Sequence, residues 1–162
     1  LGAAARSFDQ ARQLRPEFFE AHMNFAAVNA QFRGFARAEA AYRAALKLRP
    51  DDYDAQLGLA LALRGQIPER GEAAVKEAAD HIRRAKELDP QRPEAYFNEA
   101  VLEMEFAHLQ HDNSRQPLKR AQSLLEAFLV RAGDGAAYSE HVERARQRLA
   151  DIKTMLEFPI GS

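Results

Sequence analysis

The stretch that decides the fold runs from residue 33 to residue 50 and reads RGFARAEAAYRAALKLRP. Within it, Ala38, Tyr42 and Ala45 are spaced four and three residues apart, which places them on one face of an α-helix. Pro50 ends this helix, because proline lacks the backbone N–H that helical continuation needs. The same pattern occurs in three copies, at Ala4, Phe8, Ala11 and Pro16, at Ala38, Tyr42, Ala45 and Pro50, and at Ala78, Ile82, Ala85 and Pro90. The chain is therefore predicted to consist of a repeated helical unit.

Each unit is predicted to contain another helix, which precedes the helix that carries this pattern. Apolar residues recur through residues 18–32 and 53–63, and Pro93 opens a third segment of this kind at a helix position that favours proline. A degraded fourth copy of the pattern has Ala121, Leu125 and Phe128, and ends at Gly133 where the proline would fall. The repeated unit is thus a helical hairpin.

The composition favours an all-α fold and excludes several functional classes. Of 162 residues, 32 are alanine and 18 are arginine, whereas the strand-forming residues Val, Ile and Thr are scarce. The net charge of −1 offers no basic field for nucleic acid, and the lack of cysteine excludes disulfides, thiol catalysis and cysteine-based zinc sites. No apolar run is long enough to span a bilayer. The alanine and arginine content suggests a bacterium with a GC-rich genome, with the cytoplasm and the envelope both open as locations.

The repeated hairpin resembles the tetratricopeptide repeat (TPR) family, whose period is about 34 residues. The separation of Pro16 and Pro50 equals this period, and residues 33–50 resemble the turn and second helix of the family almost position for position. The first helices match less well. Where the family favours Trp, Leu, Gly and Tyr, this chain has His22, Phe25, Ala26 and Asn29, then Gln56, Leu59, Ala60 and Leu63, then Tyr96, Glu99, Ala100 and Glu103. The resemblance covers residues 1–133 and implies a right-handed superhelix of helix pairs.

The register of the pattern predicts the organisation of the chain. We expect the second helix of a truncated repeat at 1–16, a repeat at 17–50, a repeat at 51–90 with an insertion of about 6 residues, and a divergent repeat at 91–133 with an insertion of about 9. The insertions fall at 65–71 and 108–116, between the two helices of their units. Because no helix precedes residues 1–16, we expect their apolar face to be uncapped and available for self-association. This face carries Ala4, Phe8, Ala11 and Leu14.

The C-terminal segment 134–162 departs from the repeat pattern. Its apolar residues alternate at steps of four and three, which predicts one long amphipathic helix from Ala136 to Phe158. We interpret it as a capping helix over the last repeat, with a partner-binding or oligomerising helix as the alternative. The apolar residues of this helix are Tyr138, Val142, Ala145, Leu149, Ile152 and Leu156.

Candidate chemical sites are weak. His108, His111 and Asp112 could ligate a metal, but the following Asn113 and Ser114 favour a solvated turn. Glu99 and Glu103 lie one turn apart at positions that the family makes apolar, so we expect a neighbouring arginine to neutralise them. The candidates are Arg83, Arg84 and Arg120. No nucleophile has the context of a catalytic triad, and we predict neither enzymatic activity nor a cofactor.

The resemblance implies that the first helices line a concave groove that binds another protein. The implied partner-facing residues, called the groove residues below, are Glu20, Met23, Asn24, Asp54, Leu57, Leu61, Glu94, Phe97, Asn98 and Val101. Their acidic members suggest a basic, amphipathic partner segment. The predicted function is a non-catalytic interaction scaffold. The alternative is a structural component of a bacterial envelope machine, of the gliding or type IV pilus type, that uses the edges of the solenoid and the terminal helix.

Overall fold

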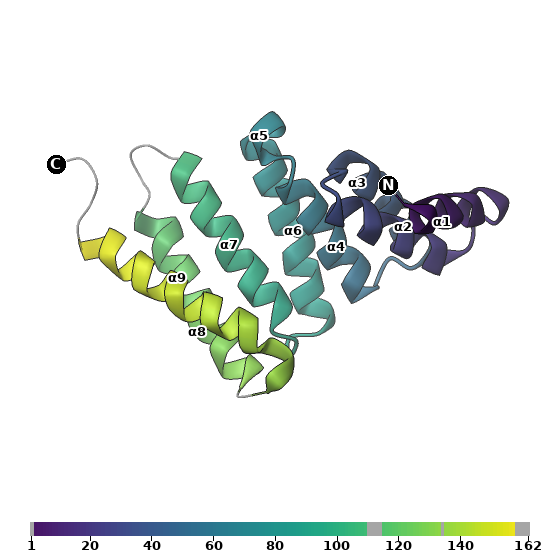
Figure 1. Cartoon of the computed structure of the whole chain (residues 1–162). Coiled ribbons are helices and arrows are strands. Elements are labelled where there is room, and N and C mark those ends of the chain that lie inside the picture. The colour runs from purple at the N-terminus through teal and green to yellow at the C-terminus, as the bar shows by residue number, and fades with distance from the viewer. Residues whose placement is uncertain (1, 110–114, 134, 158–162) are drawn as a thin grey trace. The chain divides into compact units, whose positions relative to one another are not determined.

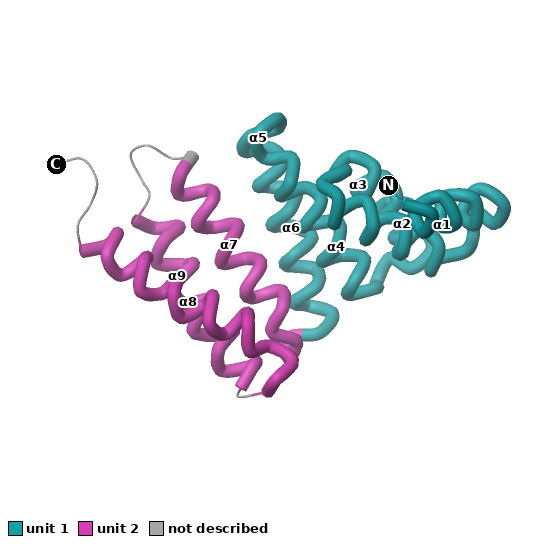
Figure 2. Tube along the Cα trace, viewed as in Figure 1, with its two compact units in different colours: residues 1–89 teal, residues 90–162 magenta. Residues whose placement is uncertain are grey.

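The structure is a computed structural model that describes residues 2–109, 115–133 and 135–157 (Figure 1). Every regular element in these residues is a helix, which confirms the all-α prediction. Contacts divide the chain into two compact units, unit 1 with residues 1–89 and unit 2 with residues 90–162 (Figure 2). The elements are α1 (Ala3–Leu14), α2 (Phe19–Gln31), α3 (Phe35–Leu48), α4 (Tyr53–Arg64), α5 (Ile67–Arg70), α6 (Glu72–Leu88), α7 (Glu94–Leu109), α8 (Arg115–Ala132), η1 (Ala136–Tyr138) and α9 (Ser139–Glu157).

Unit 1 is a succession of antiparallel helix pairs. Helices α1 and α2 pack together, as do α2 and α3, α3 and α4, and α4 and α6. The small residues of the repeated pattern lie at these crossings, and Ala38, Ala45, Ala78 and Ala85 are fully buried. Alanine at these positions lets neighbouring helix backbones approach closely. The residues that revealed the repeat in the sequence therefore form the centre of the packing.

Two glycines, one within α4 and one at its end, bring that helix onto α3. A Cβ atom at Gly58 would lie 2.4 Å from the ring of Tyr42, and one at Gly65 would lie 2.4 Å from the ring of Phe35. Real Cβ atoms do not approach other atoms this closely, so both positions require glycine for the observed packing. Tyr42, the large residue of the repeat pattern, thus fills the space that Gly58 leaves open.

The weak match of the first helices has a structural explanation. His22, Gln56 and Tyr96 occupy equivalent positions, each at the same separation from the proline that ends the preceding helix. Their side chains bond to the carbonyl oxygens of Pro16, Pro50 and Pro90 at 2.8, 2.8 and 3.0 Å. Since a carbonyl oxygen only accepts, His22 donates from Nε2. Three different residue types therefore make the same connection between the turn and the first helix.

Ion pairs attach the first insertion, which contains α5, to α3 and α6. Arg70 of α5 pairs with Glu39 of α3 at 3.3 Å and with Glu77 of α6 at 2.8 Å, and Arg43 pairs with both carboxylates. Burial would raise the pKa of Glu39, but hydrogen bonds from Gln66 and Arg43 outweigh it and lower this pKa below its ordinary value. The pKa of Glu77 is lowered by its hydrogen bond from Arg43, against burial and with help from Arg70. The insertion is thus part of an ionic network. Most of the second insertion, including His111 and Asp112, lies outside the described residues.

Unit 2 contains one helix pair and the C-terminal helix. Helix α8 packs on α7 and on α9, and Phe128, Leu125 and Ile152 are fully buried between them. The capping role predicted for the C-terminal helix is confirmed, although α9 begins at Ser139 and Tyr138 belongs to a preceding 3-10 turn. Arg120 pairs with Glu103 at 2.8 Å, as expected. Arg83 and Arg84 instead pair with acidic residues of unit 1.

Candidate protein-binding surface

Six of the groove residues lie on two helices of unit 1 that contact each other, α2 and α4. Glu20, Asn24 and Asp54 are exposed, Met23 and Leu61 are half-buried, and Leu57 is buried. The offset between Pro16 and Pro50 places Glu20 and Asp54 at equivalent positions, and likewise Met23 and Leu57. Here we call these six residues the groove surface. It combines exposed acidic and amide groups with apolar side chains.

Glu20, one acidic group of the groove surface, has a partner within the chain. Arg49 donates to Glu20 at 2.8 Å and lies over the ring of Phe19, with its guanidinium carbon 4.0 Å from the ring centre. The pKa of Glu20 is lowered by a backbone hydrogen bond and by Arg49, against the opposing effect of burial. The pKa of Tyr42 is raised by burial and by the nearby charge of Asp54. One acidic group is therefore partly neutralised within the chain, and a partner cation would compete with Arg49 for it.

The groove residues of unit 2 are largely covered by the C-terminal helix. Phe97 is buried, and its ring centre lies 5.2 Å from those of Phe128 and His141. Val101 lies in the same core as Ala145. Glu94 accepts from Arg92 at 3.1 Å and from the hydroxyl of Tyr138 at 3.0 Å. Burial would raise the pKa of Glu94, but these hydrogen bonds and one from the backbone lower it. Asn98 is half-buried and donates to the carbonyl of Glu94 at 2.8 Å.

These contacts follow a fixed register. Tyr138 contacts Glu94, His141 contacts Phe97 and Arg148 contacts Met104, with the same separation along the chain in each pair. The sequence predicts that this side of α7 faces a partner, and the structure places α9 on it. A partner role for Phe97 and Val101 stays a prediction, and it requires α9 to move.

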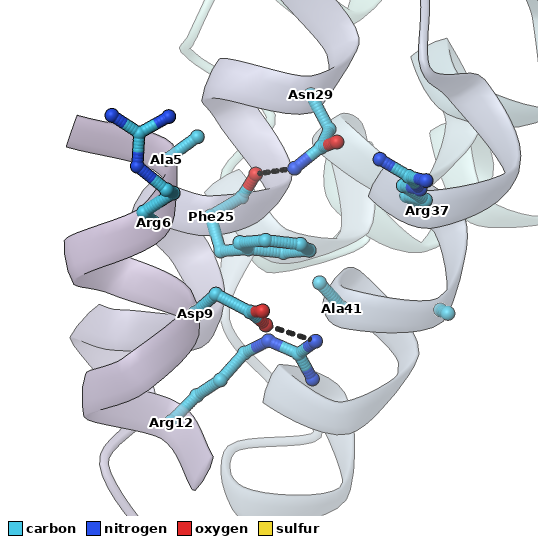
Figure 3. A pocket seen from close by; sticks show the side chains of 9 residues that line it. Ala5, Arg6, Asp9, Arg12, Phe25, Asn29, Arg37 and Ala41 are labelled. Atoms are coloured by element: carbon cyan, nitrogen blue, oxygen red, sulfur yellow. Dashed lines mark hydrogen bonds and ion pairs between the residues drawn. The ribbon is translucent and has the colours of Figure 1, made fainter. Parts of the chain in front are cut away.

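A cleft of about 430 Å³ opens between α1, α2 and α3 (Figure 3). None of the groove residues lines it. The side chains that line this N-terminal cleft are Ala5, Arg6, Asp9, Arg12, Phe25, Asn29, Arg37, Ala40 and Ala41. Arg12 pairs with Asp9 at 2.5 Å and lies 4.3 Å from the centre of the Phe25 ring. Sequence reasoning missed this cleft, because its lining comes from three helices and no local pattern joins them.

Comparison with known proteins identifies the fold. No family model matches the chain, and no curated protein sequence matches it. Solved structures do. SycD, a type III secretion chaperone of Yersinia enterocolitica solved in complex with a peptide of the translocator YopD, aligns with a TM-score of 0.69 at 18% identity over 83% of this chain and 92% of SycD. MamA of Desulfovibrio magneticus RS-1, solved from residue 41 to its end, aligns with a TM-score of 0.63 at 21% identity, over 81% of this chain and 67% of that solved chain.

The TPR protein TTC0263 of Thermus thermophilus aligns with a TM-score of 0.57 at 15% identity, over 93% of this chain and 89% of that protein. The chain has the TPR fold. In the repeat assignment predicted from the sequence, α2, α4 and α7 are the first helices of successive TPR units, and α1, α3, α6 and α8 are the second helices. Helix α9 follows α8 where the first helix of another unit would come.

In the described ranges, no group of three histidine, aspartate or glutamate residues could hold a metal ion. Gln56 joins His81 to the Pro50 carbonyl, because His81 Nδ1 and Gln56 Oε1 are 2.7 Å apart. Burial and the charge of Arg43 lower the pKa of His81, which favours its neutral form. This histidine therefore links two helices.

In the part of the chain that the structure describes, no helix has the length and apolar character that crossing a membrane requires.

Proposed function

We propose that this chain is a non-catalytic scaffold that binds a peptide or helix of another protein on the groove surface of α2 and α4. The observation that carries this proposal is the combination of exposed Glu20, Asn24 and Asp54 with half-buried Met23 and Leu61 on two adjacent first helices. Such a surface supplies apolar contact area together with polar groups that set the register of a bound segment. The likeness of the fold to SycD, which was solved with a bound peptide, supports a protein partner.

The charge of the groove surface suggests the chemistry of the partner. Glu20 and Asp54 favour lysine or arginine next to the apolar anchors of the bound segment, and they disfavour acidic segments. Since Glu20 already binds Arg49, the partner cation replaces an existing contact there. The loss of this contact should therefore reduce the contribution of Glu20 to affinity.

A peptide-display selection tests the proposal. Random peptides selected on the wild-type protein should be enriched in Arg or Lys flanking two or more apolar residues. The double variant Glu20→Lys with Asp54→Lys should lose this enrichment, because its charges repel the same peptides. The matched control is Glu72→Lys with Glu87→Lys, which makes the same charge change on α6. Equal enrichment on wild type and on the groove variant would contradict a role for the groove surface.

The alternative of a structural role in a bacterial envelope machine stays a prediction, as does self-association through α1. Leu14 at the end of α1 is 74% exposed, whereas Phe8 and Ala11 are half-buried. The face expected to be uncapped is thus partly covered by α2, which packs against α1. Its most exposed large apolar member is Leu14.

A further inference from the structure

The ring of Tyr42, on α3, packs against Gly58 in the middle of α4. A Cβ atom at Gly58 would lie 2.4 Å from Cζ of Tyr42 and 2.9 Å from its hydroxyl oxygen. The tip of this ring therefore occupies the place that a side chain at residue 58 would take. Asp54 and Leu61, two residues of the groove surface, lie one helical turn before and after Gly58. The Tyr42 hydroxyl thus lies beside the α4 part of the groove surface.

The hydroxyl of Tyr42 has no hydrogen-bond partner among the described residues. Tyr42 is only 7% exposed, but its oxygen is not one of the fully buried polar atoms that lack a partner. The small exposed part of this residue therefore includes the hydroxyl. Burial and the charge of Asp54 raise the pKa of Tyr42, so the hydroxyl keeps its proton and can donate. It is an accessible donor that the chain itself does not use.

The repeat shows what this position carries in the other units. Two other pairs of residues have the same spacing as Tyr42 and Gly58, and they are Phe8 with Asn24 and Ile82 with Asn98. In both of these pairs the first side chain has no polar group and the second residue is asparagine. In the pair of Tyr42 and Gly58, the residue of α4 has no side chain and the residue of α3 supplies a hydroxyl. The repeat thus keeps one uncharged hydrogen-bonding group here, whichever helix supplies it.

The chemistry of these groups indicates what they recognise. Asn24 on α2 is exposed, and within the described ranges its amide also makes no hydrogen bond. Neutral groups of this kind match the carbonyl and amide groups of a peptide main chain. The charge of Asp54 disfavours a carboxylate as the acceptor for Tyr42. In an α-helix, all main-chain carbonyls except those of the last turn are already bonded, so an available acceptor indicates an extended stretch.

We propose that Tyr42 is a specificity-determining residue of the groove surface, whose hydroxyl donates to a main-chain carbonyl of a peptide that crosses α4 at Gly58 in an extended conformation. This inference rests on the proposed function and narrows it, because it selects an extended peptide over a bound helix. Glycine at residue 58 is required to admit the ring, so the two residues act together. A cation of the same peptide pairs with Asp54, one turn away on α4.

The test measures binding of one peptide to the full chain. The probe is the peptide most enriched on the wild-type protein in the display selection, made synthetically. Tyr42→Phe removes an oxygen that has no partner in the described residues, so its thermal melt should stay close to that of wild type. The dissociation constant of the peptide should rise about fivefold, the effect of losing one neutral hydrogen bond. Tyr96→Phe is the matched control, because it removes the same atom in unit 2, where the hydroxyl bonds to the Pro90 carbonyl, and should leave peptide affinity unchanged.

A second measurement locates the acceptor on the peptide. Ester bonds replace the amide bonds of the peptide one at a time, since an ester carbonyl is a weaker hydrogen-bond acceptor than an amide carbonyl. At one position, the ester should weaken binding to wild type several-fold and have little effect on binding to Tyr42→Phe. Such a coupling identifies the carbonyl that bonds to the hydroxyl, and it decides the question even if Tyr42→Phe alters the melt.

An unchanged dissociation constant for Tyr42→Phe would overturn the inference. Esters that weaken binding to wild type and to Tyr42→Phe equally at every position would do the same. The proposed function survives either result if the double variant Glu20→Lys with Asp54→Lys still loses the peptide. If that double variant binds like wild type, or if the selection enriches no peptide, the groove surface is not the binding site and both proposals fail.

Discussion

Arg33, two residues beyond the end of α2, has a conformation that normally selects glycine. Its φ of 60° lies in the left-handed region, where a Cβ atom crowds the backbone. Arg33 N–H bonds to the Ala30 carbonyl at 3.0 Å and Gly34 N–H to the Asn29 carbonyl at 2.8 Å, which together make a Schellman C-cap. Gly34 has an ordinary φ of −78°, but its Cβ would lie 3.2 Å from the Asn29 side chain. Gly34 thus allows close packing against Asn29, whereas Arg33 adopts the strained backbone conformation.

We therefore expect Arg33→Gly to stabilise the protein by about 1 kcal/mol, since glycine adopts this conformation without strain. The loss of the distant contact between Arg33 and the Phe35 ring, at 5.8 Å, removes only a small part of this gain. Urea denaturation measures the change. Gly71→Ala is the opposed control, because Gly71 has a φ of 56° and free space for a Cβ atom, so only backbone strain lowers its stability. A lower midpoint for Arg33→Gly would contradict this account.

At the scale of elements, the ionic network that holds α5 predicts an acid-sensitive unit 1. Because Glu39 and Glu77 have lowered pKa values in the folded state, the unfolded chain binds more protons as the pH falls below about 4.5. The stability that these carboxylates contribute is present above this pH and is lost as the pH falls through their folded-state pKa values. Arg70→Gln should make the decline shallower and reduce stability at neutral pH by about 0.5 to 1 kcal/mol. Denaturation midpoints from pH 3 to 7 test this. An acid profile identical to wild type would exclude a role for Arg70.

Because α9 covers Phe97, substitution of Phe97 should affect the stability of unit 2. Since Phe97 is buried against Phe128 and His141, Phe97→Ala should destabilise unit 2 by about 3 kcal/mol, the usual effect of an aromatic truncation in a core. Phe32→Ala is the matched control, because Phe32 is 61% exposed and should change stability little. Chemical denaturation followed by circular dichroism compares the two. Equal, small effects would show that α9 does not cover α7 in solution.

For the whole molecule, the exposed end of α1 predicts concentration-dependent self-association. Leu14→Glu should shift sedimentation-equilibrium profiles toward the monomer, because a charge in an apolar contact is costly to bury. Val130→Glu makes the same kind of exchange at a residue of unit 2 that is 82% exposed, and it should have no effect. If Val130→Glu dissociates the protein and Leu14→Glu does not, α1 is not the interface.

Short-range sequence patterns determined the helices, their ends and the small residues at their crossings. The spacing of Ala38, Tyr42 and Ala45 and the position of Pro50 act within a few residues, so the sequence alone reveals them. The exposed members of the groove surface could be read from the same register, because the first helices of unit 1 repeat at the spacing of Pro16 and Pro50.

Tertiary structure alone decided which of the other candidate residues are accessible. From the sequence, Phe97 is predicted to be an exposed contact for a partner. In the structure, α9, which comes two helices later in the chain, packs on it. No local sequence pattern predicts a contact at that separation. The N-terminal cleft likewise depends on tertiary packing. Ala5 and Arg37 lie on different helices, and they line one cleft only because α1 and α3 flank Phe25. Helix formation is governed by neighbours along the chain, whereas burial and charge pairing are governed by neighbours in space.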